Sequence, residues 1–223
     1  MYAESFNKKI YPNAIIYAIF FIFFQVLGGK LLSLININFI TNNMTFWIYF
    51  LLFILSVIIF GKILINSIKT LFSKFDFNSL VLIGIITFFA IVFSGIVLEV
   101  TGISNSNEQE IDSALNIDCI TYILIAVAAI LFAPIAEELF FRFLLYRSVE
   151  KCNFVLAHIL VAVLFGFFHV WEYIIFDKNY IQFISMISYI CMSLGFSILY
   201  QKTKNIWYPI ILHAVINFIA IVL

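Results

Sequence analysis

Residues 120–146 read ITYILIAVAAILFAPIAEELFFRFLLY, and they indicate a helix that crosses a lipid bilayer. A spanning helix takes roughly 20 mostly apolar residues, and this stretch is longer than that. It nevertheless carries two adjacent carboxylates, Glu137 and Glu138, and the guanidinium of Arg142. Charged side chains inside a span are costly, so each of them is a candidate for a functional role.

The composition of the whole chain is that of a membrane protein. Of 223 residues, 65% are hydrophobic and only 11% are charged. A soluble domain usually has about 25% charged residues. The 28 phenylalanines and only three prolines suit a bundle of spanning helices. The 12 basic and 12 acidic residues cancel and form no basic tract, so nucleic acid is not expected as a partner.

Seven stretches have the length and apolar character of spanning helices. They are residues 13–32, 45–64, 79–100, 120–146, 154–176, 180–200 and 206–223. The fourth stretch is long enough to be tilted or broken. We therefore predict an all-α polytopic transmembrane bundle of seven spans, or eight if the fourth stretch is divided. The sequence contains no internal repeat or linker, so residues 1–223 are expected to form a single transmembrane domain.

Charges between the spans predict the orientation of the chain. The basic residues on one side of a seven-span bundle are Lys8, Lys9, Lys62, Lys69, Lys74, Arg147, Lys151, Lys202 and Lys204. On the other side, residues 101–118 contain acidic residues but no lysine or arginine. The positive-inside rule then places the N-terminus in the cytoplasm. The abundance of Ile, Phe, Asn and Lys suggests an AT-rich bacterial genome, and hence the bacterial cell membrane.

The first polar motif, EELFFR, begins at Glu137. Glu138 and Arg142 are four residues apart and share a helix face, so we predict that they pair directly. An unpaired charge in the bilayer interior would be too costly, and Arg142 would keep Glu138 ionised. Glu137 is rotated about 100° from Glu138 and is free to point into a cavity.

Two further motifs place histidines deep inside spans. FGFFH ends at His169, and HAVIN puts His213 and Asn217 four residues apart on one helix face. A lone buried histidine is more often a satisfied core residue than a catalytic one. Two of them together with an intramembrane acid pair favour a common site, around which we expect these side chains to converge. Gly166 and Gly195 are expected to allow close helix packing rather than to form an oxyanion hole.

This set of residues suits the hydrolysis of an amide bond. That reaction needs an activated water, stabilisation of the oxyanion and a proton for the leaving amine. Glu137 is the candidate base, and His169 is placed to orient or activate the same water. His213 and Asn217 are candidate donors of hydrogen bonds to the developing oxyanion.

A metal-dependent mechanism would use the same residues differently. Two histidines and one glutamate form a known ligand set for catalytic zinc, with another glutamate as base. His169 and His213 would then be metal ligands, and zinc would be the cofactor. The spacing leaves the metal and metal-free mechanisms open, since no HExxH motif occurs and the ligands would come from three helices.

The motifs EExxxR, FxxxH and HxxxN occur here in that order. In this the sequence resembles the CAAX protease and bacteriocin-processing family, also called the Abi family, which includes the type II CAAX prenyl endopeptidases. The resemblance implies an all-helical intramembrane metalloprotease fold with a membrane-facing cavity, and a motif-bearing catalytic core at about 119–223. The functional residues it implies are Glu137, Glu138, Arg142, His169, His213 and Asn217.

The expected activity is hydrolysis of peptide bonds in membrane-associated peptides or proteins, by a glutamate-dependent or metal-assisted mechanism. The expected partners are such a substrate and the lipid bilayer. Two other classes stay open: a non-catalytic membrane protein, acting in bacteriocin self-immunity or as a scaffold, and a small-molecule transporter. Transporters typically show repeats or pairs of helices interrupted by Gly and Pro, and we see neither feature in this sequence.

Overall fold

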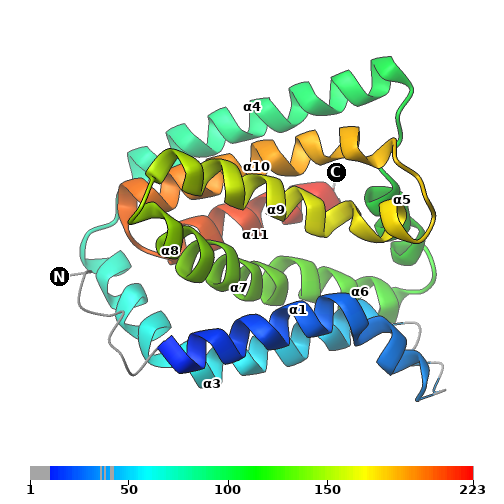
Figure 1. The fold of residues 1–223 in the computed structure, drawn as a ribbon, viewed down its shortest axis with the longest axis horizontal. Helices are drawn as coiled ribbons and strands as arrows, with labels where there is room; N and C mark the ends of the chain where they lie inside the picture. Colours follow the sequence, from blue (N-terminus) through cyan, green and yellow to red (C-terminus); the bar gives the residue numbers. More distant parts are fainter. Residues whose placement is uncertain (1–10, 36, 38, 41–42, 223) are drawn as a thin grey trace.

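The computed structural model describes residues 11–35, 37, 39–40 and 43–222, and the regular structure in these ranges is helical (Figure 1). The helices are α1 (Tyr11–Ser33), α3 (Met44–Ser73), α4 (Phe77–Thr101), α5 (Ser106–Leu115), α6 (Cys119–Val127), α7 (Ala133–Glu138), α8 (Arg147–Glu150), α9 (Phe154–Ile175), α10 (Gln182–Thr203) and α11 (Trp207–Val222). Two π-helical stretches, η1 (Ala128–Phe132) and η2 (Leu139–Tyr146), join α6, α7 and α8 into one continuous helix. We call this helix, Cys119–Glu150, the motif helix.

The predicted all-α polytopic bundle is confirmed. Within the described residues, six helical stretches are long and apolar enough to cross a membrane, and α11 is an apolar helix of 16 residues. These seven correspond to the seven predicted stretches, and the fourth is a single helix of 32 residues rather than two spans. The chain is thus an integral membrane protein.

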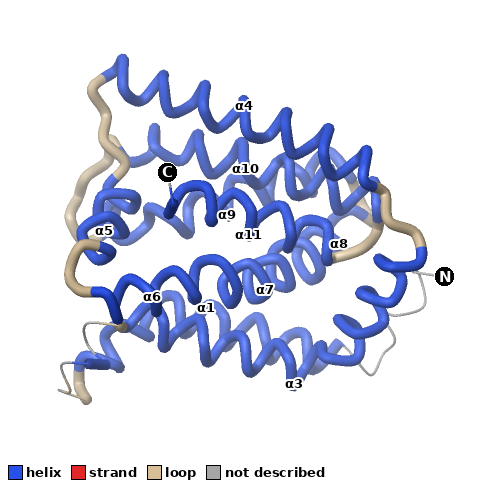
Figure 2. The backbone as a smooth tube through the Cα atoms, turned by 180° about the vertical axis from the view of Figure 1, so that it is seen from behind, coloured by secondary structure: helices blue, strands red, loops and turns tan. Residues whose placement is uncertain are grey.

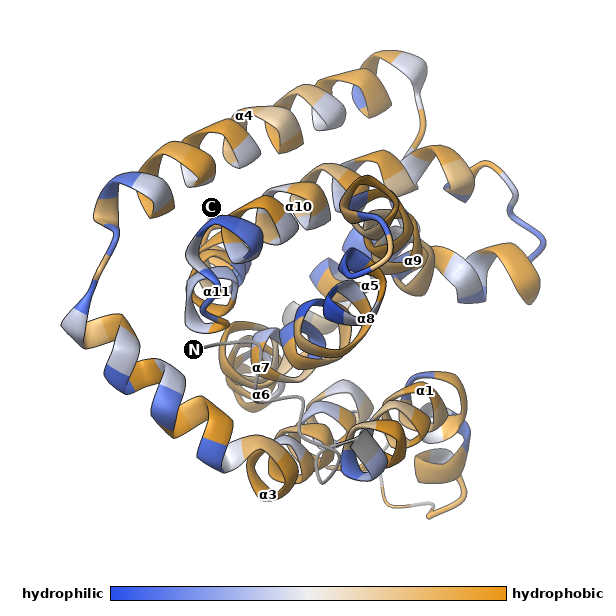
Figure 3. Ribbon diagram, turned by 60° about the vertical axis from the view of Figure 1, so that its left-hand side comes forward, coloured by the Kyte–Doolittle hydropathy of each residue, from blue (hydrophilic) through white to orange (hydrophobic). Residues whose placement is uncertain are grey.

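The bundle has polar groups inside and apolar groups outside. Glu138 and Arg142 are fully buried, whereas Phe72, Phe89 and Val100 are largely exposed. Figure 1 and Figure 2 show α4 at one edge and the pair α1 and α3 at the opposite edge, with the motif helix, α9, α10 and α11 between them. Figure 3 shows hydrophobic residues along most helices and hydrophilic residues gathered in the connections. Lipid is the solvent that suits such a surface.

Capping side chains define where several helices begin. Asp118 accepts hydrogen bonds from the backbone N–H groups of Ile120 and Thr121 and so starts the motif helix. Asp76 and Asn153 cap α4 and α9 in the same way. The hydrogen bonds from the Thr121 backbone and hydroxyl lower the pKa of Asp118 below its ordinary value. Such caps satisfy N–H groups that have no partner within the helix.

The motif helix widens into π-helical geometry on both sides of α7. Pro134 has no N–H and cannot make the normal hydrogen bond to the preceding turn, and η1 ends two residues before it. The π-helical geometry is rare and occurs often at functional sites. Here the short segment between the two widened stretches ends on Glu137 and Glu138.

Two segments differ from the sequence prediction. The second span continues past its predicted end at Leu64 to Ser73, so Lys69 lies on a helix instead of in a loop. The amide of Asn205, just before α11, donates to the carbonyl of Ser67 within the extension at 2.8 Å, and the indole of Trp207 donates to the carbonyl of Leu64 at 2.9 Å. Residues 101–118 contain the short helix α5 rather than loop alone.

The predicted packing roles of two glycines are confirmed. A Cβ at Gly195, on α10, would lie 2.0 Å from the hydroxyl oxygen of Thr87 on α4. A Cβ at Gly166, on α9, would lie 3.2 Å from the carbonyl oxygen of Met186. The absence of a side chain therefore brings helix backbones together, as small residues do in membrane bundles.

Gly195→Ala is expected to lower the free energy of unfolding by about 1–3 kcal/mol, because the methyl group must displace Thr87 and with it α4. Denaturant titration in detergent, followed by circular dichroism, measures the effect. Gly95→Ala is the control, since a Cβ there meets nothing within 4 Å. Equal effects of the two substitutions would contradict this account of the α4–α10 contact.

Candidate active site

Two of the motifs, EELFFR and HAVIN, meet at the carboxylate of Glu138. Its Oε1 accepts hydrogen bonds from Nη1 of Arg142 and from Nδ1 of His213, both at 2.9 Å. Glu138 and Arg142 are fully buried and His213 is 2% exposed. The predicted pairing of Glu138 with Arg142 is confirmed, and α11 contributes His213 to the same ion-pair cluster.

The second terminal nitrogen and the faces of the Arg142 guanidinium also have partners, whereas its buried Nε has no hydrogen-bond partner among the described residues. Its Nη2 donates to the carbonyl of Ser193 at 3.1 Å and to the hydroxyl at 2.5 Å. The rings of Phe165 and Phe196 lie 4.9 and 5.1 Å from the guanidinium carbon. A buried cation is tolerated when charge, hydrogen bonds and aromatic faces surround it in this way. Arg142 therefore ties the motif helix to α10 through Ser193.

Glu137 has one occupied and one unpaired carboxylate oxygen. Oε1 accepts a hydrogen bond from the hydroxyl of Tyr49, on α3, at 2.5 Å. Oε2 is buried and has no hydrogen-bond partner among the described residues. It lies 3.9 Å from Nε2 of His213, which is too long for a direct hydrogen bond. The unpaired oxygen thus faces the free nitrogen of the imidazole.

Both histidines are held through Nδ1. In His169 this atom lies 2.8 Å from the carbonyl of Phe165, which can only accept a hydrogen bond. In His213 it lies 2.9 Å from Glu138, whose carboxylate also accepts from a guanidinium. These partners assign the proton of each neutral imidazole to Nδ1, so Nε2 presents a lone pair.

The ring of Phe165 lies close to both motif histidines. The ring centroids are 4.5 Å apart for Phe165 and His169, and 5.8 Å apart for Phe165 and His213. The ring of Tyr189, on α10, stacks on the imidazole of His169 with a centroid distance of 4.3 Å. His169 is partly exposed, in contrast to the buried His213. It is thus the motif histidine with access from outside the cluster.

Asn217 stabilises the widened turn of the motif helix. Its Nδ2 donates to the carbonyl of Ala129, in η1, at 2.7 Å. In π-helical register this carbonyl would pair with the N–H of residue 134, and Pro134 has none. Asn217 therefore supplies the missing donor. Its role as an oxyanion donor stays a prediction, and it requires the amide nitrogen to leave Ala129.

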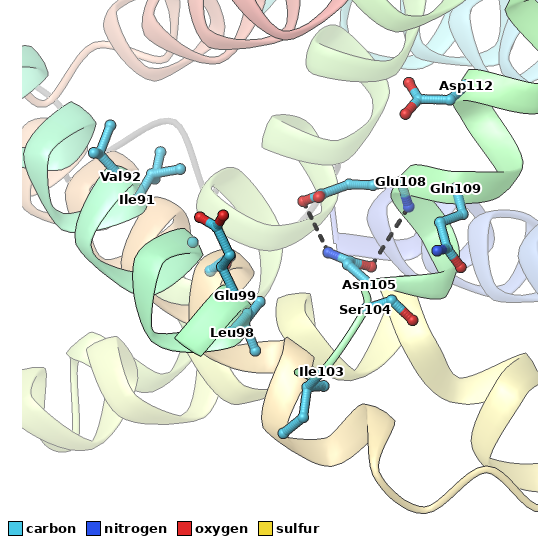
Figure 4. Close-up of a pocket in the computed structure, with 12 residues that line it drawn as sticks. Ile91, Val92, Leu98, Glu99, Ile103, Ser104, Asn105, Glu108, Gln109 and Asp112 are labelled. Carbon is cyan, nitrogen blue, oxygen red and sulfur yellow. Dashed lines mark hydrogen bonds between the residues drawn. The ribbon is translucent and has the colours of Figure 1, made fainter. Parts of the chain in front are cut away.

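A groove of about 480 Å³ lies between α4, α5 and α10, beside the cluster rather than in it (Figure 4). Glu108 and Asn105 in its wall are hydrogen-bonded to each other, and burial raises the pKa of Glu108. The amide of Asn105 also donates to the hydroxyl of Tyr189 at 3.0 Å. The side chain of Tyr189 thus contacts both Asn105 in the wall of the groove and the ring of His169. None of the six predicted functional residues lines the groove.

The donor chemistry of the cluster suits zinc. His169 and His213 each present Nε2 while Nδ1 is held by an acceptor, an arrangement common for metal-binding histidines. Glu137 adds an unpaired carboxylate oxygen. In the described part of the chain, however, no three such side chains are gathered as a formed metal centre. A zinc site therefore remains a prediction.

Three residues that complete the cluster were not predicted from the sequence: Tyr49, Tyr189 and Ser193. Their hydroxyl groups cost little in a spanning helix, so they do not interrupt the apolar pattern as a carboxylate does. A serine or tyrosine inside a span therefore gives too weak a signal to be recognised before the helices are packed.

Comparison with known proteins agrees with the motifs. Residues 120–219 match the family described as "Type II CAAX prenyl endopeptidase Rce1-like". A protein of Bacillus subtilis (strain 168) described as "Putative membrane peptidase YdiL" is 30% identical over 101 residues. That alignment covers 45% of this chain and 37% of the relative. No solved structure matches the chain significantly.

Proposed function

Because residues 120–219 match the family described as "Type II CAAX prenyl endopeptidase Rce1-like", we propose that this chain is an intramembrane endopeptidase. Its substrates would be membrane-associated peptides or proteins. The catalytic core would comprise about residues 119–223, within a single transmembrane domain formed by the whole chain. The observation that carries the proposal is the buried, unpaired Oε2 of Glu137, which faces Nε2 of His213.

Glu137 acts as the general base in this proposal. Its Oε2 takes a proton from water as the water oxygen attacks the peptide carbonyl carbon. The same proton then passes to the amide nitrogen as the C–N bond breaks, leaving a carboxylic acid and an amine. The lone pair of His169 orients the attacking water by accepting its second hydrogen. A base that lies in a water-poor interior is well placed for this role.

The other motif residues hold this arrangement. Arg142 donates a hydrogen bond to Glu138, and Glu138 fixes the tautomer and the ring orientation of His213. For His213 to donate a hydrogen bond to the oxyanion, its Nε2 must carry a proton. We propose that the reactive form of His213 has taken this proton from solvent before the attack and returns it to solvent after the products leave.

The same side chains carry donor atoms of the kind that zinc accepts. We propose that it would be held by Nε2 of His169, Nε2 of His213 and the carboxylate of Glu137. A bound zinc ion would supply Lewis acidity toward the carbonyl oxygen and a more acidic water. Metal analysis of the purified protein, with and without chelator treatment, tests this proposal alongside the cleavage assay.

Cleavage in water enriched in oxygen-18 tests the proposed function. The purified protein, reconstituted in liposomes with a membrane-inserted peptide library, is expected to release fragments that carry one oxygen-18 atom in the new carboxylate. Mass spectrometry detects the label and locates the cleaved bond. Failure to cleave any member of a library containing prenylated and unmodified peptides would refute the proposal.

A scaffold and a transporter are the competing classes. Neither requires a carboxylate whose free oxygen faces an imidazole lone pair. The charged cluster also lies between helices of the motif-bearing half, where Arg142 is fully buried. A transporter would need a path for its solute on both sides of this cluster. We therefore favour the hydrolase.

For the orientation, we propose a cytoplasmic N-terminus in the bacterial cell membrane. Two connections with basic residues meet at one end of the bundle. There Lys204 pairs with Glu150 at 3.0 Å, and the amide of Asn205 donates to the backbone carbonyl of Ser67. The acidic helix α5 lies at the other end. Lys8 and Lys9 lie outside the described residues. The positive-inside rule assigns the basic end to the cytoplasm.

The native cysteines give a test of this orientation. Cys119 and Cys152 are exposed and flank opposite ends of the motif helix. In intact cells, a membrane-impermeant maleimide is expected to label a variant that retains only Cys119. A variant that retains only Cys152 should react only after the cells are opened. The reverse pattern would overturn the assignment.

A further inference from the structure

The N-terminal helices α1 and α3 lie outside the family match at 120–219, yet they contact the centre of the candidate site. Tyr49, on α3, donates its hydroxyl hydrogen to Oε1 of Glu137 at 2.5 Å. Tyr17, on α1, donates to the carbonyl of Ala136 at 2.8 Å and also contacts the hydroxyl of Ser56 on α3. Two hydroxyl groups from the N-terminal pair thus hold adjacent residues of α7.

The hydrogen bond from Tyr49 determines which carboxylate oxygen of Glu137 is left without a partner. Tyr49 occupies Oε1, and Oε2 is left without a partner, 3.9 Å from Nε2 of His213. A hydrogen bond to an ionised acceptor is shorter and stronger than one between neutral groups. It therefore restricts rotation of the carboxylate, which otherwise has no side-chain donor among the described residues.

We propose that Tyr49 is a positioning residue for Glu137 and that the α1–α3 pair is a functional part of the active site. This inference rests on the proposed function, because it gives Tyr49 a task in the same reaction. Tyr49 neither attacks nor exchanges a proton with the substrate. It holds the carboxylate of Glu137 so that Oε2 faces the place where the water reacts.

Tyr49→Phe removes only the hydroxyl group and is the central test. The kcat for peptide cleavage is expected to fall roughly 10- to 100-fold, which corresponds to loss of a hydrogen bond to a charged group. KM should stay within about twofold, since the substrate-binding surface is unchanged. A fall in kcat with constant KM separates positioning of the base from general destabilisation.

Tyr146→Phe is the matched control. It also removes a buried tyrosine hydroxyl, one that lies 3.1 Å from Nε2 of His158 on α9. Its kcat is expected to stay within about twofold of the unsubstituted protein. Equal losses of kcat in both variants, or an unchanged kcat in Tyr49→Phe, would overturn the inference while the proposed function stands.

A spectroscopic measurement tests the contact without reference to activity. Isotope-edited infrared spectra of the protein and of Glu137→Gln identify the carboxylate stretching band of Glu137. Tyr49→Phe is expected to shift that band, and Tyr146→Phe to leave it in place. Site-specific 3-fluorotyrosine at position 49 provides a second variant, which keeps the hydroxyl and changes its donor strength.

The two measurements separate the possible failures. An active protein whose Glu137 band does not respond to Tyr49→Phe would refute the positioning role alone. A protein that cleaves no peptide but shows the band shift would refute the proposed hydrolase, and the catalytic part of this inference with it. The expected result is the band shift together with the selective loss of kcat.

Discussion

Glu137→Gln is expected to lower the rate of peptide cleavage by about 10²- to 10⁴-fold, the range typical for removal of a general base. Glutamine has nearly the same shape and can still accept the hydrogen bond from Tyr49 through its carbonyl oxygen. It cannot take a proton from water. The loss should therefore appear in kcat, and the far-UV circular dichroism and the elution volume of the protein should not change.

Glu99→Gln serves as the control for that experiment. Glu99 lies near the end of α4, outside the charged cluster, and its side chain is exposed. It should retain the full rate of cleavage. If Glu137→Gln were as active as this control, the base would be misassigned. If both variants and the unsubstituted protein retained a cellular phenotype without any cleavage, a scaffold would be the better description.

Arg142→Met is expected to lower the free energy of unfolding by about 3–5 kcal/mol. Methionine fills much of the same space but leaves the carboxylate of Glu138 buried without its cation. It also removes the two hydrogen bonds to Ser193 that connect the motif helix to α10. Denaturant titration in detergent measures the loss, and reduced accumulation in the membrane should accompany it.

Two further variants show whether the cost comes from the unpaired charge. The double substitution Glu138→Gln with Arg142→Met removes both charges, and it should recover a large part of the lost stability. Lys204→Met breaks the exposed pair with Glu150 and should cost less than about 1 kcal/mol. Equal losses from the exposed and the buried pair would contradict the assignment of Arg142 as the electrostatic anchor.

Much of the fold could be predicted because its signals are local. A run of about 20 apolar residues is sufficient to indicate a span, and all seven predicted stretches correspond to helices. The pairing of Glu138 with Arg142 follows from the helical repeat alone, since residues four apart share a face. The end of α3 was misplaced because the segment after Leu64 is stabilised by Asn205, which is distant in the sequence and donates to the carbonyl of Ser67.

The site itself was only partly predictable. Glu137, His169 and His213 stand out because a charge or an imidazole inside a span is costly. Tyr49, Tyr189 and Ser193 do not stand out. The spacing of Asn217 from His213 suggests a shared role, but the side-chain amide of Asn217 donates to the backbone carbonyl of Ala129. That bond exists because Pro134 leaves a carbonyl unpaired on a neighbouring helix.

The sequence by itself determined that the chain is a membrane-spanning helical bundle, which residues carry its intramembrane charges, and that two of these charges pair. Only the tertiary structure decided that Tyr49 holds Glu137, that Ser193 holds Arg142 and that His213 joins Glu138. The physical reason is that contacts within a helix follow its own period, whereas contacts between helices depend on their tilt and rotation. Those are set by side-chain packing over the whole bundle, as where Gly195 lets α10 approach Thr87.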